Sequence, residues 1–121
     1  MARVLIVDDV HETVELITMA VNHLGHEAIG THSAQSAMEQ LVESEPDLIL
    51  MDFMMPGRDG LQTLRDIRSL PQGRSIPILF STASSDKILE ERVLAAGGNG
   101  LLHKPLGLTE LDRAIKRYAT G

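Results

Sequence analysis

Five polar residues able to handle a phosphoryl group each lie at the end of a short apolar run: Asp8, Asp9, Asp52, Thr82 and Lys104. The runs cover residues 4–7, 48–51, 78–80 and 101–102. If these runs are parallel strands of one sheet, their carboxyl ends lie at one edge, where open α/β sheets bind their ligands. Three carboxylates, a hydroxyl group and an ammonium group would then share one crevice.

This set of groups suits phosphoryl chemistry. Three carboxylates in one crevice repel each other unless a cation lies among them. Oxygen ligands of this kind suit Mg²⁺, which also keeps several water molecules. With Mg²⁺ and Lys104 present the site is electrically neutral. Asp52 could then attack phosphorus in line, while the metal and Lys104 hold the phosphoryl oxygens and Thr82 donates a hydrogen bond.

Each residue alone has an ordinary structural explanation. Asp9 and Asp59 could be helix N-caps, Asp52 could be a turn residue, and Thr82 could cap a helix. Lys104 could be a solvated surface charge. The placement of the five polar residues at the ends of successive runs favours the shared site instead.

The elements that must position these residues alternate along the chain. Short apolar runs separated by longer helical periods predict βα units around a parallel sheet. The expected strands cover residues 3–7, 27–31, 48–51, 77–81 and 100–103. The run 48–51 is apolar on both faces, as in a strand covered by helices on both sides. The least apolar run, 27–31, is expected at a sheet edge.

Five helices are expected between and after these strands. The first has apolar residues at helical spacing from Val10 to Leu24 and ends at Gly25. Polar residues are expected to begin the others: Ser33, Asp59, Ser85 or Asp86, and Thr109, the last forming a capping box with Asp112. Gly97-Gly98 is expected to end the fourth helix. This alternation predicts a single domain over residues 1–121.

Composition excludes several classes of function. The 121 residues suit one domain, and the absence of cysteine excludes disulfides, a thiolate nucleophile and a cysteine zinc site. A net charge of −6 without a basic cluster disfavours direct nucleic acid binding. No run has the length of a signal-peptide core or a membrane span, so we expect a cytoplasmic protein without membrane contact.

The chain resembles the receiver domains of two-component response regulators, the CheY-like superfamily, over essentially its whole length. The resemblance lies in VLIVDD at 4–9, DLILMDFMMPGRDG at 47–60, ILFSTAS at 78–84 and KP at 104–105. It implies a flavodoxin-like (βα)5 doubly wound fold, with a five-stranded parallel sheet in the order 2-1-3-4-5.

The resemblance also implies roles for the residues around the acceptor. Asp52 matches the phosphoryl-accepting aspartate. Asp8 and Asp9 match the acidic pair that holds Mg²⁺, with Asp9 as a direct ligand and Asp8 acting through water. The main-chain carbonyl of Met54 matches the backbone metal ligand. Side chains at Phe53, Met54 and Ser84 are expected to border the reacting group and influence its access to water.

Further matches concern the switch. Thr82 matches the hydroxyl residue that follows the phosphoryl group on activation, and Lys104 matches the lysine that pairs with the acyl phosphate. The bond before Pro105 is cis in the family. Leu101 takes the place of a frequent Tyr or Phe that moves with the hydroxyl residue, and it can still change between packed and exposed rotamers. Gly98-Asn99 replaces the acidic pair of receivers that dimerise through a charge network.

The function implied is regulatory rather than enzymatic. A sensor histidine kinase or histidine phosphotransfer protein would phosphorylate Asp52, and slow self-catalysed hydrolysis would reset it. The acyl phosphate would shift the face formed by the fourth helix, fifth strand and fifth helix. We expect a monomer or weak dimer, while the kinase and the downstream target stay open.

Two alternatives use the same residues differently. A phosphohydrolase of the haloacid dehalogenase type would need an Asp-x-Asp motif after the first strand, where this chain has Asp8-Asp9-Val10, and a substrate cap. A binding module that acts without phosphorylation is disfavoured because all five site residues are present.

His23, His26 and His103 are expected to lie outside the site. His23 and His26 could share a helix face as metal ligands, but no third ligand lies nearby in the sequence. Strand alternation directs His103 away from the face used by Lys104.

Overall fold

Five parallel strands and five α-helices alternate along the chain in a computed structural model that describes residues 1–119. The strands are β1 Arg3–Val7, β2 Glu27–Thr31, β3 Leu48–Asp52, β4 Ile78–Thr82 and β5 Gly100–His103. The helices are α1 His11–His23, α2 Ala34–Ser44, α3 Gly60–Ser69, α4 Lys87–Ala95 and α5 Leu108–Tyr118, with a 3₁₀ turn at Pro71–Gly73. The strand order β2-β1-β3-β4-β5 confirms the predicted doubly wound fold.

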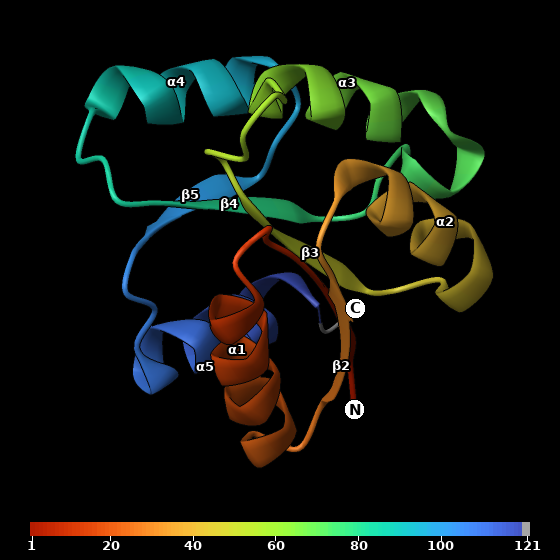
Figure 1. The fold of residues 1–121 in the computed structure, drawn as a ribbon, viewed down its shortest axis with the longest axis vertical. Helices are drawn as coiled ribbons and strands as arrows, with labels where there is room; N and C mark the ends of the chain where they lie inside the picture. Colours follow the sequence, from red (N-terminus) through yellow and green to blue (C-terminus); the bar gives the residue numbers. More distant parts are fainter. Residues whose placement is uncertain (120–121) are drawn as a thin grey trace.

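Helices cover both faces of the sheet (Figure 1). α1 and α5 lie on one face, and α2, α3 and α4 lie on the other. Alternation along β1 serves both layers: Leu5 and Val7 belong to the core under α2, α3 and α4, whereas Val4 and Ile6 belong to the core under α1 and α5. The sheet is therefore buried on both sides, as the apolar runs predict.

The central strands β3 and β4 are buried along their entire length. Phe80 of β4 is fully buried and meets Phe53 edge-on, with ring centroids 5.4 Å apart. Burial of one side chain of this size stabilises a fold by roughly 2–3 kcal/mol. Both strands end one residue later than predicted, so Asp52 and Thr82 are their last residues rather than the first residues after them.

Three predicted helix caps are confirmed. The side chains of Ser33, Asp59 and Asp86 each accept a hydrogen bond from a main-chain N–H in the first turn of the helix that follows. Positive φ angles of 88° at Gly25 and 102° at Gly97 end α1 and α4 at the predicted glycines.

The predicted start of the last helix is wrong. α5 begins at Leu108 with Gly107 as its N-cap residue, so Thr109 lies inside the first turn and caps nothing. The helix forms without a side-chain cap because Leu111, Ala114 and Ile115 are buried in the core beneath α1 and α5. A cap contributes about 1 kcal/mol, less than the burial of several apolar side chains.

None of the helices within residues 1–119 combines the length and the apolar character needed to cross a membrane.

Arg68 of α3 joins the ends of the strands that lie away from the predicted site. Its guanidinium group donates to the carbonyl oxygens of Gly73, Ile76 and Gly97 at 2.6–3.1 Å. It also donates to the side-chain oxygen of Asn99 at 3.1 Å, and that oxygen accepts the main-chain N–H of Ile78 at 2.9 Å. One side chain thus ties α3 to the amino ends of β4 and β5.

We predict that Arg68→Met lowers the free energy of unfolding by about 2 kcal/mol, because several partly buried carbonyl groups lose their donor. Urea unfolding measures the effect. Arg65→Met is the matched control, since Arg65 is exposed on the same helix and makes no hydrogen bond or ion pair with residues 1–119. An equal loss in both variants would contradict this account.

Candidate functional site

The structure brings the predicted site residues together at the carboxyl edge of the sheet. Asp8 follows β1, Asp52 ends β3, Thr82 ends β4 and Lys104 follows β5. β1, β3 and β4 are neighbours in the sheet, and β5 pairs with β4. The parallel pairing therefore places all four ends in one crevice.

Lys104 lies between two buried carboxylates. Its Nζ is 3.0 Å from Oδ2 of Asp8 and 3.4 Å from Oδ2 of Asp52. Asp8 and Asp52 are only 1 % and 6 % exposed, so water screens their charges poorly. The single ammonium group is the positive charge that offsets two carboxylates.

Each of these carboxylates is also oriented by the main chain. Oδ1 of Asp8 accepts the N–H of Val10 at 3.0 Å, and Oδ1 of Asp52 accepts the N–H of Met54 at 3.2 Å. In both cases the donor lies two residues further along, which is an Asx turn. The turns fix Oδ1 and leave Oδ2 facing Lys104.

The third carboxylate, Asp9, completes a cluster. One oxygen from each of Asp8, Asp9 and Asp52 lies within 4.8 Å of the others, and this is the one such cluster found among residues 1–119. Asp9 is exposed, which leaves the cluster open to solvent. Three carboxylate oxygens at an open site fit Mg²⁺, which retains waters in its remaining positions.

Burial and charge shift the pKa values of two groups. Burial raises the pKa of Asp52, and the negative charge of Asp8 raises it further, against the lowering effects of the Met54 N–H and Lys104. Burial alone would lower the pKa of Lys104, but its hydrogen bond to Asp8 and the charges of both carboxylates raise it overall. Lys104 therefore stays protonated at neutral pH, whereas the surroundings of Asp52 disfavour its ionised form.

Thr82 connects the site to its surroundings. Its hydroxyl oxygen accepts the N–H of Ser84 at 3.1 Å, and its carbonyl accepts the N–H of Lys104 at 2.8 Å. Lys104–Pro105 is a cis peptide bond. Leu101 is half-buried against the core formed with α2, α3 and α4.

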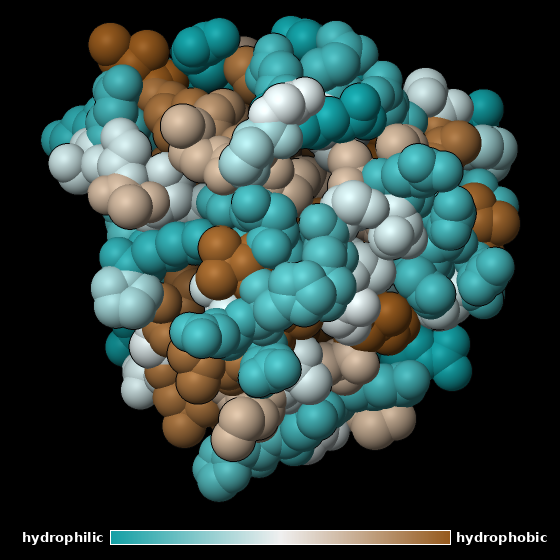
Figure 2. Space-filling view, in the orientation of Figure 1, coloured by the Kyte–Doolittle hydropathy of each residue, from teal (hydrophilic) through white to brown (hydrophobic). Residues whose placement is uncertain are grey.

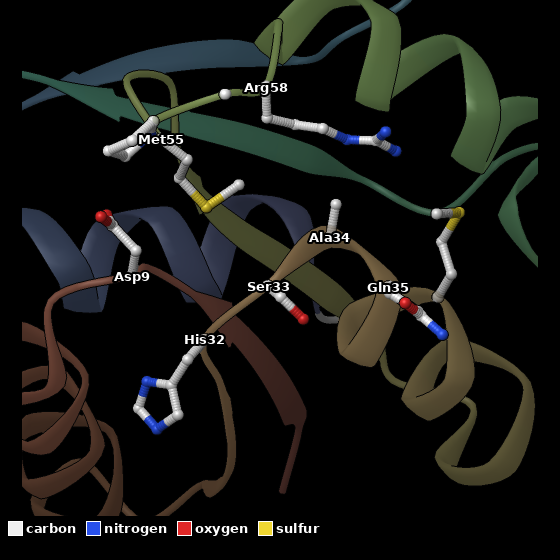
Figure 3. Close-up of a pocket in the computed structure, with 10 residues that line it drawn as sticks. Asp9, His32, Ser33, Ala34, Gln35, Met55 and Arg58 are labelled. Atoms are coloured by element: carbon white, nitrogen blue, oxygen red, sulfur yellow. The ribbon is translucent and has the colours of Figure 1, made fainter.

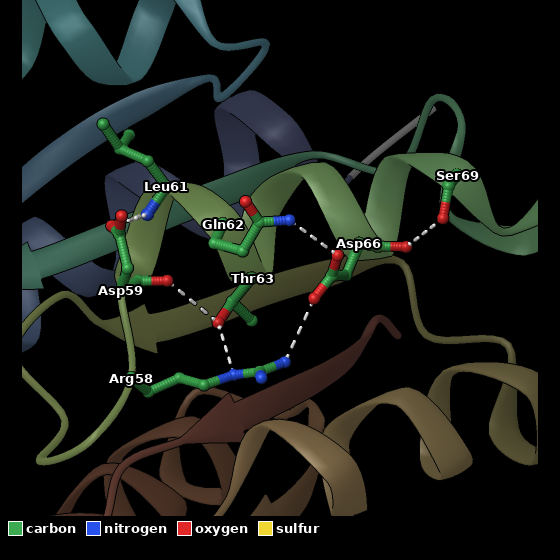
Figure 4. A network of polar contacts seen from close by, with 7 residues as sticks. All are labelled: Arg58, Asp59, Leu61, Gln62, Thr63, Asp66 and Ser69. Atoms are coloured by element: carbon green, nitrogen blue, oxygen red, sulfur yellow. Dashed lines mark hydrogen bonds and ion pairs between the residues drawn. The ribbon is translucent and has the colours of Figure 1, made fainter.

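Arg58 anchors the loop after Asp52 to α3 (Figure 4). Its guanidinium group donates to Oγ1 of Thr63 and pairs with Asp66, each at 3.1 Å. Asp59 caps α3 through the N–H of Leu61 at 3.0 Å. Sequence analysis identified the cap but missed Arg58, whose partners are five and eight residues away on a helix face. The loop that carries Met54 is thus held at its far end.

A pocket of about 470 Å³ lies beside the exposed carboxylate (Figure 3). Its lining includes Asp9, His32, Met55 and Arg58. The Asp9 carboxylate points toward the loop that carries Met55, whereas the His32 ring points away from it. His32 is therefore not directed at the carboxylate cluster. Met55 itself is buried, in keeping with a packing role.

His32 stacks on His11, with ring centroids 3.8 Å apart and ring planes inclined by 7°. Sequence analysis did not predict this pair. The sequence did contain a signal for the pair, because the two histidines follow β1 and β2, which are neighbouring parallel strands.

The other histidines lie outside the cluster, as expected. Nδ1 of His26 accepts the N–H of Ala2 at 3.0 Å, and His103 is exposed. Neither they nor His23 belong to a group of potential metal ligands within residues 1–119.

Comparison with known proteins gives a consistent result. The family model of the response regulator receiver domain matches residues 4–116. The phosphate regulon transcriptional regulatory protein PhoB of Escherichia coli is 32 % identical over 114 residues, which are 94 % of this chain and 50 % of that protein. The uncharacterized transcriptional regulatory protein YrkP of Bacillus subtilis is 34 % identical over 93 % of this chain and 47 % of its own length. The chain thus spans about half the length of these curated relatives.

Solved structures resemble this chain over almost all of it. The chemotaxis protein CheY4 of Vibrio cholerae superposes with a TM-score of 0.91 at 25 % identity, covering 98 % of both chains. The receiver domain of the sensor histidine kinase PA1611 of Pseudomonas aeruginosa gives a TM-score of 0.86 at 30 % identity, covering 98 % of this chain and 97 % of its own. That structure has a magnesium ion in its active site cleft.

We predict that Asp52→Asn stabilises the metal-free protein at pH 7 by on the order of 1 kcal/mol. Because the folded chain holds the Asp52 proton more tightly than the unfolded chain, ionisation of Asp52 begins to oppose folding as the pH rises above 3.8 and does so fully above its raised pKa. The gain should disappear as the pH falls toward 3.8, the ordinary pKa of the group. Denaturant unfolding in EDTA at several pH values measures it.

Magnesium provides the control for this prediction. Mg²⁺ should stabilise the wild-type chain more than Asp52→Asn, which keeps only two of the three carboxylates. A variant less stable than wild type at pH 7 in EDTA would contradict the electrostatic account.

Proposed function

This chain belongs to the response regulator receiver domain family, and from that premise we propose that it is the phosphoryl-accepting switch of a two-component phosphorelay. The observation that carries the proposal is the Lys104 ammonium group between Asp8 and Asp52, with Asp9 completing the acidic cluster. Asp52 is the proposed acceptor. Residues 1–121 are the proposed receiver domain.

Four groups are proposed to hold Mg²⁺: the carboxylates of Asp9 and Asp52 and the main-chain carbonyl of Met54 directly, and the carboxylate of Asp8 through water. When bound, the ion supplies positive charge that offsets the repulsion between the carboxylates and the incoming phosphoryl group. The three-carboxylate cluster supports this assignment, as does the acidic site typical of receiver domains.

The chain's own residues account for the transfer. A carboxylate oxygen of Asp52 attacks phosphorus as the bond from phosphorus to the donor imidazole breaks. Lys104 already lies 3.4 Å from Asp52, so its ammonium group can move onto the phosphoryl oxygens with little rearrangement. Met54 and Ser84 flank the acceptor and are the side chains expected to control how water reaches the acyl phosphate.

Thr82 and Leu101 are the proposed switch. The Thr82 hydroxyl oxygen accepts the N–H of Ser84, so movement of the hydroxyl group toward the phosphoryl group would release the start of the connection to α4. Space vacated by Thr82 can then be filled from neighbouring β5, where Leu101 is half-buried. The proposed result is a population shift of the face formed by α4, β5 and α5, through which the downstream target is reached.

The proposed donor is a phosphohistidine of a sensor kinase or phosphotransfer protein. Its imidazole must come within bonding distance of Asp52, so the donor has to cover the rim of the crevice. An apolar groove of about 420 Å³ adjoins that rim, lined by Leu16, Ile17 and Leu106 and reaching Lys104. Figure 2 shows an apolar area over α1 and α5. This groove is the proposed donor surface.

Incubation with acetyl phosphate and Mg²⁺ should add about 80 Da, the mass of one phosphoryl group. Intact mass spectrometry measures the gain, which Asp52→Asn or EDTA should abolish. Asp112→Asn, on α5, is the matched control and should be phosphorylated like wild type.

Two results would contradict the proposal. A mass gain that persists in Asp52→Asn would exclude Asp52 as the acceptor. Rapid multiple-turnover hydrolysis of a phosphate monoester would favour the dehalogenase-type enzyme instead.

Thr82→Ala should uncouple phosphorylation from the conformational change. Beryllofluoride with Mg²⁺ should still bind at Asp52, but the amide chemical shift changes over α4, β5 and α5 should fall several-fold, because the hydroxyl group that follows the phosphoryl group is missing. Thr82→Ser keeps the hydroxyl group and should respond like wild type. Full shift changes in Thr82→Ala would exclude Thr82 as the switch.

A further inference from the structure

In the phosphorylated form of the proposed site, the negative charges exceed the positive charges by about one. A phosphoryl group on Asp52 carries about two negative charges at neutral pH. Asp8 and Asp9 add one each, while Lys104 and Mg²⁺ supply three positive charges in total. About one negative charge is left over in a crevice whose walls are largely buried.

Most cations near this crevice are already engaged. Lys104 pairs with Asp8 and Asp52, and Arg58 pairs with Asp66 and donates to Thr63. Lys87 and Arg92 of α4 are not engaged: both are exposed and make no side-chain hydrogen bond or ion pair with residues 1–119, and of the two it is Arg92 that lines a pocket beside Asp52.

Arg92 lines a pocket that borders the acceptor. The pocket, of about 420 Å³, lies between the residues that follow β3, the residues that follow β4, and α4. Its lining includes Phe53, Met54, Thr82, Asp86 and Arg92. The pocket is therefore lined by the two residues that follow Asp52 in the chain and by the proposed switch residue Thr82.

The direction of the helix favours approach of Arg92 to the site. Side chains of an α-helix lean toward its N-terminus. The N-terminus of α4 follows the carboxyl end of β4, where Thr82 lies. Ile88 and Leu89 precede Arg92 by four and three residues, so all three share the helix face that lines the pocket.

The pocket holds one competing charge, the carboxylate of Asp86. That group caps α4 by accepting the N–H of Ile88 at 2.9 Å and forms no ion pair with Arg92 among the described residues. Arg92 is thus available for an anion that arrives at Asp52.

We propose that Arg92 is the second cation of the phosphorylated site: its guanidinium group swings across the pocket and pairs with the phosphoryl oxygens on Asp52. A guanidinium fork suits this task because it donates two parallel hydrogen bonds to a phosphoryl group. The inference rests on the proposed function and adds a contact made only after phosphorylation.

Beryllofluoride is the probe, because its complex with Asp52 carries the charge and shape of the acyl phosphate. Affinity is measured at saturating Mg²⁺ from amide chemical shifts, since the chain has no tryptophan. Arg92→Gln should bind beryllofluoride about 3- to 10-fold more weakly than wild type, and Arg92→Lys should lie between them. Arg113→Gln is the matched control, since Arg113 lines a different pocket between α4, β5 and α5.

Salt separates an ionic contact from a structural effect. The difference between wild type and Arg92→Gln should shrink as ionic strength rises from 0.05 to 1 M, because the screening length falls to about 3 Å. The free energy of unfolding without beryllofluoride should be the same in both, as Arg92 is exposed and unpaired within residues 1–119.

The possible failures are distinguishable. If wild type binds beryllofluoride and Arg92→Gln binds it equally well at low salt, only the role of Arg92 is overturned. An equal loss in Arg113→Gln would also overturn it, because the effect would then reflect net charge. If wild type does not bind beryllofluoride at all, the proposed function fails as well.

Discussion

The contact on which the site depends is the placement of one ammonium group between two buried carboxylates. Asp8 and Asp52 would repel each other at the end of neighbouring strands, and burial would increase the repulsion. Lys104 offsets part of this energy, but the pKa of Asp52 still lies above its ordinary value because of burial. The folded chain therefore holds a carboxylate, that of Asp52, whose charge is incompletely balanced, and it gains stability from any cation that joins the cluster.

Parallel topology makes this arrangement possible. Asp8 and Asp52 are 44 positions apart in the chain, and Asp52 and Lys104 are 52 positions apart. All three reach the same crevice because the strands are parallel and end at the same edge of the sheet. Two cores, one on each side of the sheet, hold the strands in register without help from the polar cluster. The apolar layers supply the stability, and the edge is free to carry charges that oppose folding.

The sequence allowed much of this to be predicted, because strand ends and phosphoryl chemistry leave local patterns. Asp8, Asp52, Thr82 and Lys104 could be placed from the apolar runs that precede them. The start of α5 could not, since the cap signal at Thr109 is local, whereas α5 is held by burial of Leu111, Ala114 and Ile115 in a core built from distant parts of the chain. The contacts of Arg68 with Gly97 and Asn99 span 29 and 31 residues and carry no periodic signal.

The Arg68 contacts restrain one end of β4 and β5 only. They fix the amino ends of β4 and β5, while the carboxyl ends of the same strands carry Thr82 and Lys104. In the proposed switch, a displacement at Thr82 would therefore move the carboxyl ends of the two strands and the start of α4, while the amino ends stay fixed to α3.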